Sequence, residues 1–142
     1  MKKFSFELEK ILEFRNFEKQ EAEAELAKAL SKETEIKNNL EMIANQMIVS
    51  NQSVNNSSSF DDVIAQSRYK NLLNYQKDEL LKELAQANLV TEEKRSVLAE
   101  CMKKTVALEK LKEKRKEEWK IACDYEEAEE IDEASNHLKS VN

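Results

Sequence analysis

The 142-residue chain contains no glycine and no proline. These residues normally make up about 7% and about 5% of a protein, and they supply most tight turns and helix breaks. A chain without them has few means of ending a helix. Its residues are 37% charged and 40% hydrophobic, which is too little apolar material for a globular core but enough for a seam along two helices. We therefore predict an all-α protein.

A 3.5-residue apolar period runs through the first third of the chain. Alternating steps of four and three residues from 8 to 54 meet an apolar residue at ten of fourteen positions, the exceptions being Arg15, Lys19, Glu33 and Ser50. A period sustained over this length indicates a coiled-coil seam. The apolar members are Leu8, Leu12, Ala22, Leu26, Ala29, Ile36, Leu40, Ile43, Met47 and Val54.

The polar stretch SNQSVNNSSSFDD, residues 50–62, interrupts this pattern. Ser and Asn are unfavourable inside helices because their side chains compete for backbone hydrogen bonds, and Asn tolerates the left-handed conformation of a helix end. Ser59 followed by Asp62 resembles a capping box that starts a new helix. We predict one domain over residues 1–142, with helix one at about 4–55, a turn at about 56–59 and helix two at about 60–138.

The predicted second helix carries a looser apolar stripe. Its phase shifts between about residues 87 and 98, where Thr91 and Lys94 interrupt it, and such a shift implies local over- or underwinding of the supercoil. The stripe consists of Leu73, Leu80, Leu84, Ala87, Leu98, Cys101, Leu108, Leu111, Ala122, Ile131 and Leu138.

A short connection between two long helices predicts an antiparallel coiled-coil hairpin. With the turn near residue 57, facing residues should have numbers that add up to about 114, and the longer second helix should overhang from about residue 115. The alternative is one continuous helix that pairs in a parallel dimer. The thirteen residues of the polar stretch disfavour it, because they include few good helix formers.

The end of the second helix is basic and then acidic. Residues 103–120 carry a net charge of +4, and residues 121–142 carry −6. Four Glu residues interleave the lysines and the acidic block would repel phosphate, so no nucleic-acid partner is expected. The basic block is then either a solvated helix face with i,i+4 ion pairs or a protein-binding surface.

The aromatic residues form two groups. One lies at the start of helix one with Trp119 and Tyr125 nearby, and the other, with Phe60, Tyr69 and Tyr75, lies near the turn. The four Phe residues of the first group point over too wide an arc to enter one seam, so the exposed ones are candidate anchors for a partner. They are Phe4, Phe6, Phe14 and Phe17.

No catalytic or metal-binding pattern is present in the sequence, so we expect a protein without enzymatic activity, cofactor or metal. A Gly-rich phosphate loop is impossible, His137 is the single histidine, and Cys101 and Cys123 fit no metal-ligand spacing. The sequence contains no apolar stretch long enough to span a membrane, and no apolar signal-peptide core follows Lys2 and Lys3. We therefore expect the protein to stay in the cytoplasm, with its cysteines reduced.

The chain resembles the FliJ family, the small coiled-coil components of the bacterial flagellar type III export apparatus. The opening FSFELEKILEFRNFEKQEAEAELAKA is similar to the start of that family, with an aromatic pair, Leu-Glu-Lys-Ile-Leu, an Arg and a Glu/Ala run. VALEKLKEKRKEEW is similar to its Leu-Glu-Lys-Leu signature, and residues 131–134, IDEA, resemble its ending. Family members often have Gln or Lys before the Asp-Glu pair, where this chain has Ala128, Glu129 and Glu130.

The resemblance implies an antiparallel two-helix rod, similar to the stalk of rotary ATPases, that binds the hexameric export ATPase and promotes its assembly and activity. It also implies contact with the cytoplasmic domain of the membrane export gate and with export chaperones, at the flagellar basal body on the inner membrane. We expect a protein that is monomeric alone. The predicted ATPase-binding residues are Leu108, Leu111, Lys112, Arg115 and Trp119. The positions matching the gate-binding surface are Ile43, Gln46, Ser50, Leu72 and Gln76, with Tyr69 nearby.

Two other functions remain open. One is a structural coiled-coil scaffold or spacer with no ATPase partner. The other is the analogous stalk of a virulence type III secretion system.

Overall fold

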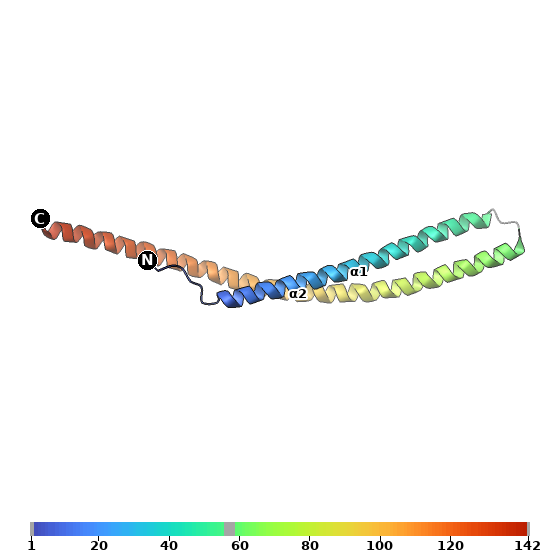
Figure 1. The fold of residues 1–142 in the computed structure, drawn as a ribbon, viewed down its shortest axis with the longest axis horizontal. Helices are drawn as coiled ribbons and strands as arrows, with labels where there is room; N and C mark the ends of the chain where they lie inside the picture. The colour runs from blue at the N-terminus through green and yellow to red at the C-terminus, as the bar shows by residue number, and fades with distance from the viewer. Residues whose placement is uncertain (1, 56–58, 142) are drawn as a thin grey trace. The chain divides into compact units, whose positions relative to one another are not determined.

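The computed structural model describes residues 2–55 and 59–141, which form two long helices. Helix α1 spans Glu9–Asn55 and helix α2 spans Phe60–Val141, with 47 and 82 residues (Figure 1). The described residues include no strand. The predicted all-α hairpin with a longer second helix is therefore confirmed. Residues 56–58, which include most of the predicted turn, lie outside the described residues.

The two helices begin in different ways. Ser59 caps α2, since its Oγ accepts a hydrogen bond from the Asp62 N–H at 3.1 Å and its carbonyl accepts one from Val63 at 3.2 Å. Helix α1 begins at Glu9, later than the predicted start near residue 4, and residues 2–6 before it are not helical. The N–H of Glu9 donates to the Phe6 carbonyl at 3.2 Å, which satisfies one of the free donors at the helix start.

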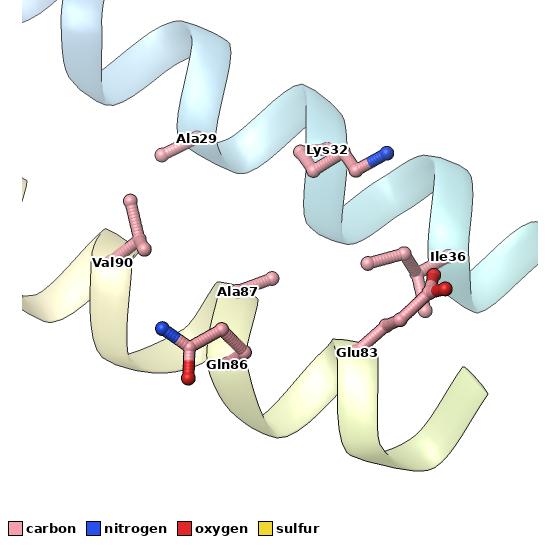
Figure 2. A pocket seen from close by; sticks show the side chains of 7 residues that line it. All are labelled: Ala29, Lys32, Ile36, Glu83, Gln86, Ala87 and Val90. Carbon is pink, nitrogen blue, oxygen red and sulfur yellow. The ribbon is translucent and has the colours of Figure 1, made fainter. Parts of the chain in front are cut away.

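The chain divides into two compact units, and α1 and α2 pair within each. Unit 1 comprises Met1–Gln20 with Ala99–Asn142, and unit 2 comprises Glu21–Leu98. In unit 2, Ala29 lies across from Val90 and Ile36 across from Glu83 (Figure 2). In unit 1, Thr105 contacts Arg15, and Trp119 contacts Lys2. In both units, residues further along α1 contact residues further back along α2. The pairing is therefore antiparallel, which contradicts the continuous parallel dimer.

The apolar period of α1 is the seam that packs against α2. The described positions predicted from residue 8 to residue 50 are all buried or half-buried, including the four that carry polar side chains. The four-three alternation places one stripe of side chains toward the partner helix, and few residues outside the stripe are covered. The predicted seam of helix one is confirmed.

The predicted phase shift in α2 is wrong. Thr91 is only 2% exposed, and Lys94 is half-buried, so both occupy the seam instead of interrupting it. The steps Ala87, Thr91, Lys94, Leu98 keep the four-three alternation. Thr91 is tolerated there because its hydroxyl donates to the Ala87 carbonyl at 3.0 Å and leaves no buried donor unpaired.

The register of the pairing also differs from the expected one. Facing residue numbers add up to 120–122 in unit 1 and to about 119 in unit 2, not to about 114. The difference is close to one heptad, and sliding one helix by a heptad brings the same seam positions back into contact. As a result the first turn of α2 has no residue of α1 opposite it, and Phe60 is 78% exposed.

Helix α2 continues past the last residue that pairs with the start of the chain. Trp119 makes the final such contact, and the described residues 120–141 are exposed except for Cys123, which is half-buried (Figure 1). The predicted overhang is confirmed, although it starts a few residues later than expected because of the shifted register. None of the helices in the described ranges has a stretch long and apolar enough to cross a membrane.

The seam predicts a large difference between two aliphatic residues of unit 2. Ile36 is 2% exposed and Leu89 is 67% exposed. Ile36→Ala should lower the free energy of unfolding by about 2–4 kcal/mol, because it opens a cavity in the seam. Leu89→Ala, the matched control, should change it by less than about 0.5 kcal/mol. Urea unfolding followed by far-UV circular dichroism measures both, and equal effects would contradict this seam.

Candidate functional site

The five predicted ATPase-binding residues lie together on α2 in unit 1. Leu108, Lys112, Arg115 and Trp119 follow one another at steps of four, three and four, so they form one stripe on the helix, with Leu111 beside it. We call these five residues the α2 stripe. All are half-buried except Arg115, which is exposed.

The N-terminal segment, residues 2–8, lies against the α2 stripe. The indole N–H of Trp119 donates to the Lys2 carbonyl at 3.1 Å, and the Trp119 ring packs against Phe4 with ring centroids 5.8 Å apart and a 55° tilt. Arg115 forms an ion pair with Glu7. Next to the segment, Lys112 Nζ pairs with Glu9 Oε2 at 2.8 Å. The stripe therefore combines one aromatic ring with two cations, and all three groups contact residues at the start of the same chain.

Two cations of the basic block, residues 103–120, form ion pairs within the chain. Lys112 and Arg115 face carboxylates of the chain's own start, whereas the other lysines between 103 and 120 are exposed. The side chains of the Lys112–Glu9 pair are 37% and 42% exposed, so solvent weakens the attraction, and such a pair typically contributes at most about 1 kcal/mol. The block as a whole keeps a positive surface available to a partner.

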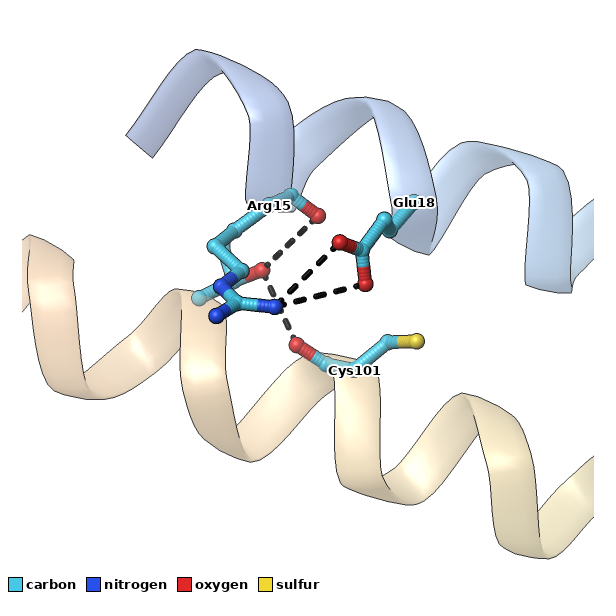
Figure 3. Close-up of polar contacts among 4 residues, drawn as sticks. Arg15, Glu18 and Cys101 are labelled. Atoms are coloured by element: carbon cyan, nitrogen blue, oxygen red, sulfur yellow. Dashed lines mark hydrogen bonds and ion pairs between the residues drawn. The ribbon is translucent and has the colours of Figure 1, made fainter. Parts of the chain in front are cut away.

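A polar layer crosses the seam of unit 1 next to the stripe (Figure 3). Thr105 is 1% exposed, and its Oγ1 lies 3.0 Å from the Cys101 carbonyl and 3.4 Å from the Arg15 carbonyl of α1. A hydroxyl has one proton, so the shorter contact is the main hydrogen bond. The Arg15 side chain turns to Glu18, with Nη1 3.2 Å from Oε1. The layer places the Thr105 hydroxyl between carbonyls of α1 and α2, and the half-buried charge of Arg15 is paired with Glu18 beside it.

The four Phe residues at the start of the chain separate as their spacing predicted. Phe6 is buried and Phe4 is half-buried against Trp119, whereas Phe14 and Phe17 are exposed on α1. The Arg15 guanidinium lies 5.9 Å from the centroid of the Phe14 ring, at cation–π distance. Phe14 and Phe17 thus remain available as anchors, as does Tyr125 of α2, which is also exposed.

Four of the six positions matched to the gate-binding surface lie on one face of unit 2. On α1, Gln46 continues a stripe with Met42, Val49 and Ser53. On α2, Tyr69, Leu72 and Gln76 follow at steps of three and four. Two grooves join these stripes: one of about 430 Å³ includes Gln46 and Gln76, and one of about 370 Å³ includes Gln46 and Tyr69. We call this surface the unit 2 groove face.

Ile43 differs from the other predicted gate residues, and three further residues were missed. Ile43 is 8% exposed, so its side chain packs mainly in the seam, although it also lines the larger of these two grooves. Ser50, half-buried, lines the smaller groove. The missed residues Met42, Val49 and Tyr75 are exposed and apolar, and they line the same grooves. Their signal in the sequence is an apolar residue directly before a seam position, as at Met42 and Val49.

Small residues create another groove in unit 2, away from the predicted sites. Ala29 of α1 and Ala87 of α2 are both buried in the seam, and they line a groove of about 360 Å³ (Figure 2). The charged ends of Lys32 and Glu83 lie at its rim. The residues that line it are Ala29, Lys32, Ile36, Glu83, Gln86, Ala87 and Val90.

The chemistry of the described residues is that of binding surfaces. Among residues 2–55 and 59–141, no group of three or more His, Cys, Asp and Glu side chains is placed to hold a metal ion. Cys101 and Cys123 are free, half-buried thiols on α2. The grooves are open and lie along the helix pair, and both are lined by apolar and polar side chains of α1 and α2.

Two phenylalanines of unit 1 provide a matched test of how the N-terminal segment is held. Phe6→Ala should lower the free energy of unfolding by about 2–3 kcal/mol, because Phe6 is 8% exposed and anchors the segment. Phe17→Ala should change it by less than about 0.5 kcal/mol, because Phe17 is 55% exposed. Thermal or urea unfolding measures both, and an insensitive Phe6 would show that the segment is not packed in solution.

Comparison with known protein families gives a match over nearly the whole chain. The family model described as "Flagellar FliJ protein" matches residues 4–141, which is nearly the whole chain. No curated protein and no solved structure gives a significant match. The family match includes the N-terminal segment from Phe4, the seam of both helices and the overhang of α2. The chain therefore belongs to the flagellar FliJ family, the non-enzymatic components of flagellar type III protein export.

Proposed function

We propose that the protein binds the hexameric flagellar export ATPase as a central-stalk-like rod and promotes its assembly and activity. The observation that carries the proposal is the family match over residues 4–141. The antiparallel helix pair supports it, because such a pair presents side chains of both helices on one narrow surface that can enter a ring. In unit 1 this surface contains the start of the chain and the basic block of α2.

The α2 stripe is the proposed ATPase contact. Trp119 and Arg115 belong to the residue types that most often dominate protein interfaces, and the surrounding exposed lysines favour a partner with a negative surface. Leu108 and Leu111, both half-buried, would add apolar area where a partner excludes water. We assign the contact to Leu108, Leu111, Lys112, Arg115 and Trp119.

The unit 2 groove face is the proposed contact with the cytoplasmic domain of the export gate. Its exposed apolar side chains include Tyr69, which lines the smaller groove, and Leu72 on the same side of α2, and the polar side chains of Gln46 and Gln76 border them. An exposed apolar patch with a polar rim is typical of a protein-binding surface. By linking the ATPase to the gate and by meeting export chaperones, the protein would work in the cytoplasm at the inner-membrane base of the flagellum.

The ATPase contact is tested by ATP hydrolysis and co-sedimentation with the same organism's export ATPase. The wild-type protein should bind and stimulate hydrolysis. Leu111→Ala with Arg115→Glu should reduce binding at least about tenfold, because an apolar contact is lost and a charge is reversed at the centre of the stripe. The matched control, Leu89→Ala with Arg95→Glu, makes the same changes at exposed positions of unit 2 and should behave as wild type.

Two outcomes would count against the ATPase contact. Equal loss in both double variants would move the contact away from the α2 stripe. A wild-type protein that is helical by circular dichroism but neither binds nor stimulates the ATPase would favour a structural spacer instead.

The gate contact is tested with the purified cytoplasmic domain of the export gate. Tyr69→Ala with Leu72→Ala should weaken binding at least about tenfold, because two exposed side chains of the groove face are removed together. ATPase stimulation should stay unchanged. Leu81→Ala with Leu89→Ala removes two exposed leucines of α2 that line neither groove, and it should bind normally. Normal binding by the Tyr69 and Leu72 variant would exclude this face.

A further inference from the structure

The N-terminal segment occupies the surface that the proposed function assigns to the ATPase. Lys2, Phe4 and Glu7 contact Trp119 and Arg115, and Glu9 at the start of α1 contacts Lys112. Three of the five residues of the α2 stripe are therefore already engaged within the chain. A partner that binds these groups has to compete with contacts that the chain already makes to them.

The contacts define the chemistry that this surface accepts. The Trp119 indole N–H donates to a backbone carbonyl, so that bond does not depend on the side chain of Lys2. The Trp119 ring packs against a second aromatic ring. Arg115 and Lys112 bind carboxylates through ion pairs. The surface is suited to a short non-helical segment that carries an aromatic residue followed by acidic residues.

The segment is held in a way that permits release. Glu7 and Arg115 have side chains that are 72% and 47% exposed, so water can replace their ion pair with little loss. Residues 2–5 lie outside α1, so they can leave while Phe6 stays packed and its carbonyl keeps the hydrogen bond from the Glu9 N–H. Phe6 alone is buried, and the α1–α2 seam from Leu12 onward does not depend on residues 2–5.

We propose that the N-terminal segment is a displaceable latch on the α2 stripe. The export ATPase replaces it with a segment of its own that presents an aromatic ring to Trp119 and a carboxylate to Arg115. Only molecules with an uncovered stripe can bind the ATPase, so the latch lowers the apparent affinity for the ATPase in proportion to the fraction of molecules that are covered. This inference rests on the proposed function, because it needs the ATPase to bind at the stripe.

The test uses the full-length chain and its single tryptophan. Phe4→Ala with Glu7→Gln removes the ring contact and the ion pair of the latch but keeps Phe6 and the seam. Phe60→Ala with Asp61→Asn, the matched control, removes an aromatic ring and a carboxylate from exposed positions of unit 2. Trp119 is the only tryptophan, so its emission reports the latch in the protein alone. ATPase affinity is then measured for wild type and both variants, after circular dichroism has shown equal helicity.

The expected result is an emission shift to longer wavelength and an affinity for the ATPase that rises about three- to tenfold in the latch variant. The control should match wild type in both measurements. Unchanged emission would overturn the proposal, because Trp119 would not be covered in solution. Shifted emission with equal or weaker affinity would overturn the latch and leave the proposed ATPase contact intact. Absence of binding by all three proteins would overturn both.

Discussion

The 3.5-residue seam between two antiparallel helices is the constraint on which the rest of the structure depends. It places one stripe of each helix in contact and leaves most of the other described side chains to solvent or to partners. The seam alone does not choose a register, since a slide of one heptad restores the same contacts. In unit 1 the observed register brings Glu9 to Lys112, Glu7 to Arg115 and Lys2 to Trp119. Each contact is weak, but a register is selected by a difference between alternatives, so weak specific contacts can decide it.

Polar and small residues shape the seam without breaking it. Thr91 and Thr105 are almost fully buried, and each satisfies its hydroxyl on a carbonyl of its own helix. Ala29 and Ala87 leave space that opens as a groove. The seam therefore holds the helices together and also provides, along its edges, the concave surfaces that a uniform leucine seam would fill.

The lysine-dense stretch has two roles in this chain. Lys112 and Arg115 bind the carboxylates of the chain's start, while the exposed lysines around them keep the surface positive. Unit 1 thus carries a basic and aromatic surface, and unit 2 carries an apolar groove face. A component of flagellar export with two chemically different surfaces is suited to two different partners. The latch adds a means by which one of these surfaces can be closed until a partner arrives.

The sequence by itself determined the all-α class, the seam of α1, the helix break after Asn55, the Ser59 cap and the overhang, because each follows from local spacing and backbone chemistry. Only the tertiary structure decided the register, the covered positions of Thr91 and Lys94, and the non-helical course of residues 2–6. It also decided that Met42, Val49 and Tyr75 share grooves with Gln46. These features depend on which residues of the other helix lie opposite, and a single helix period contains no information about its partner.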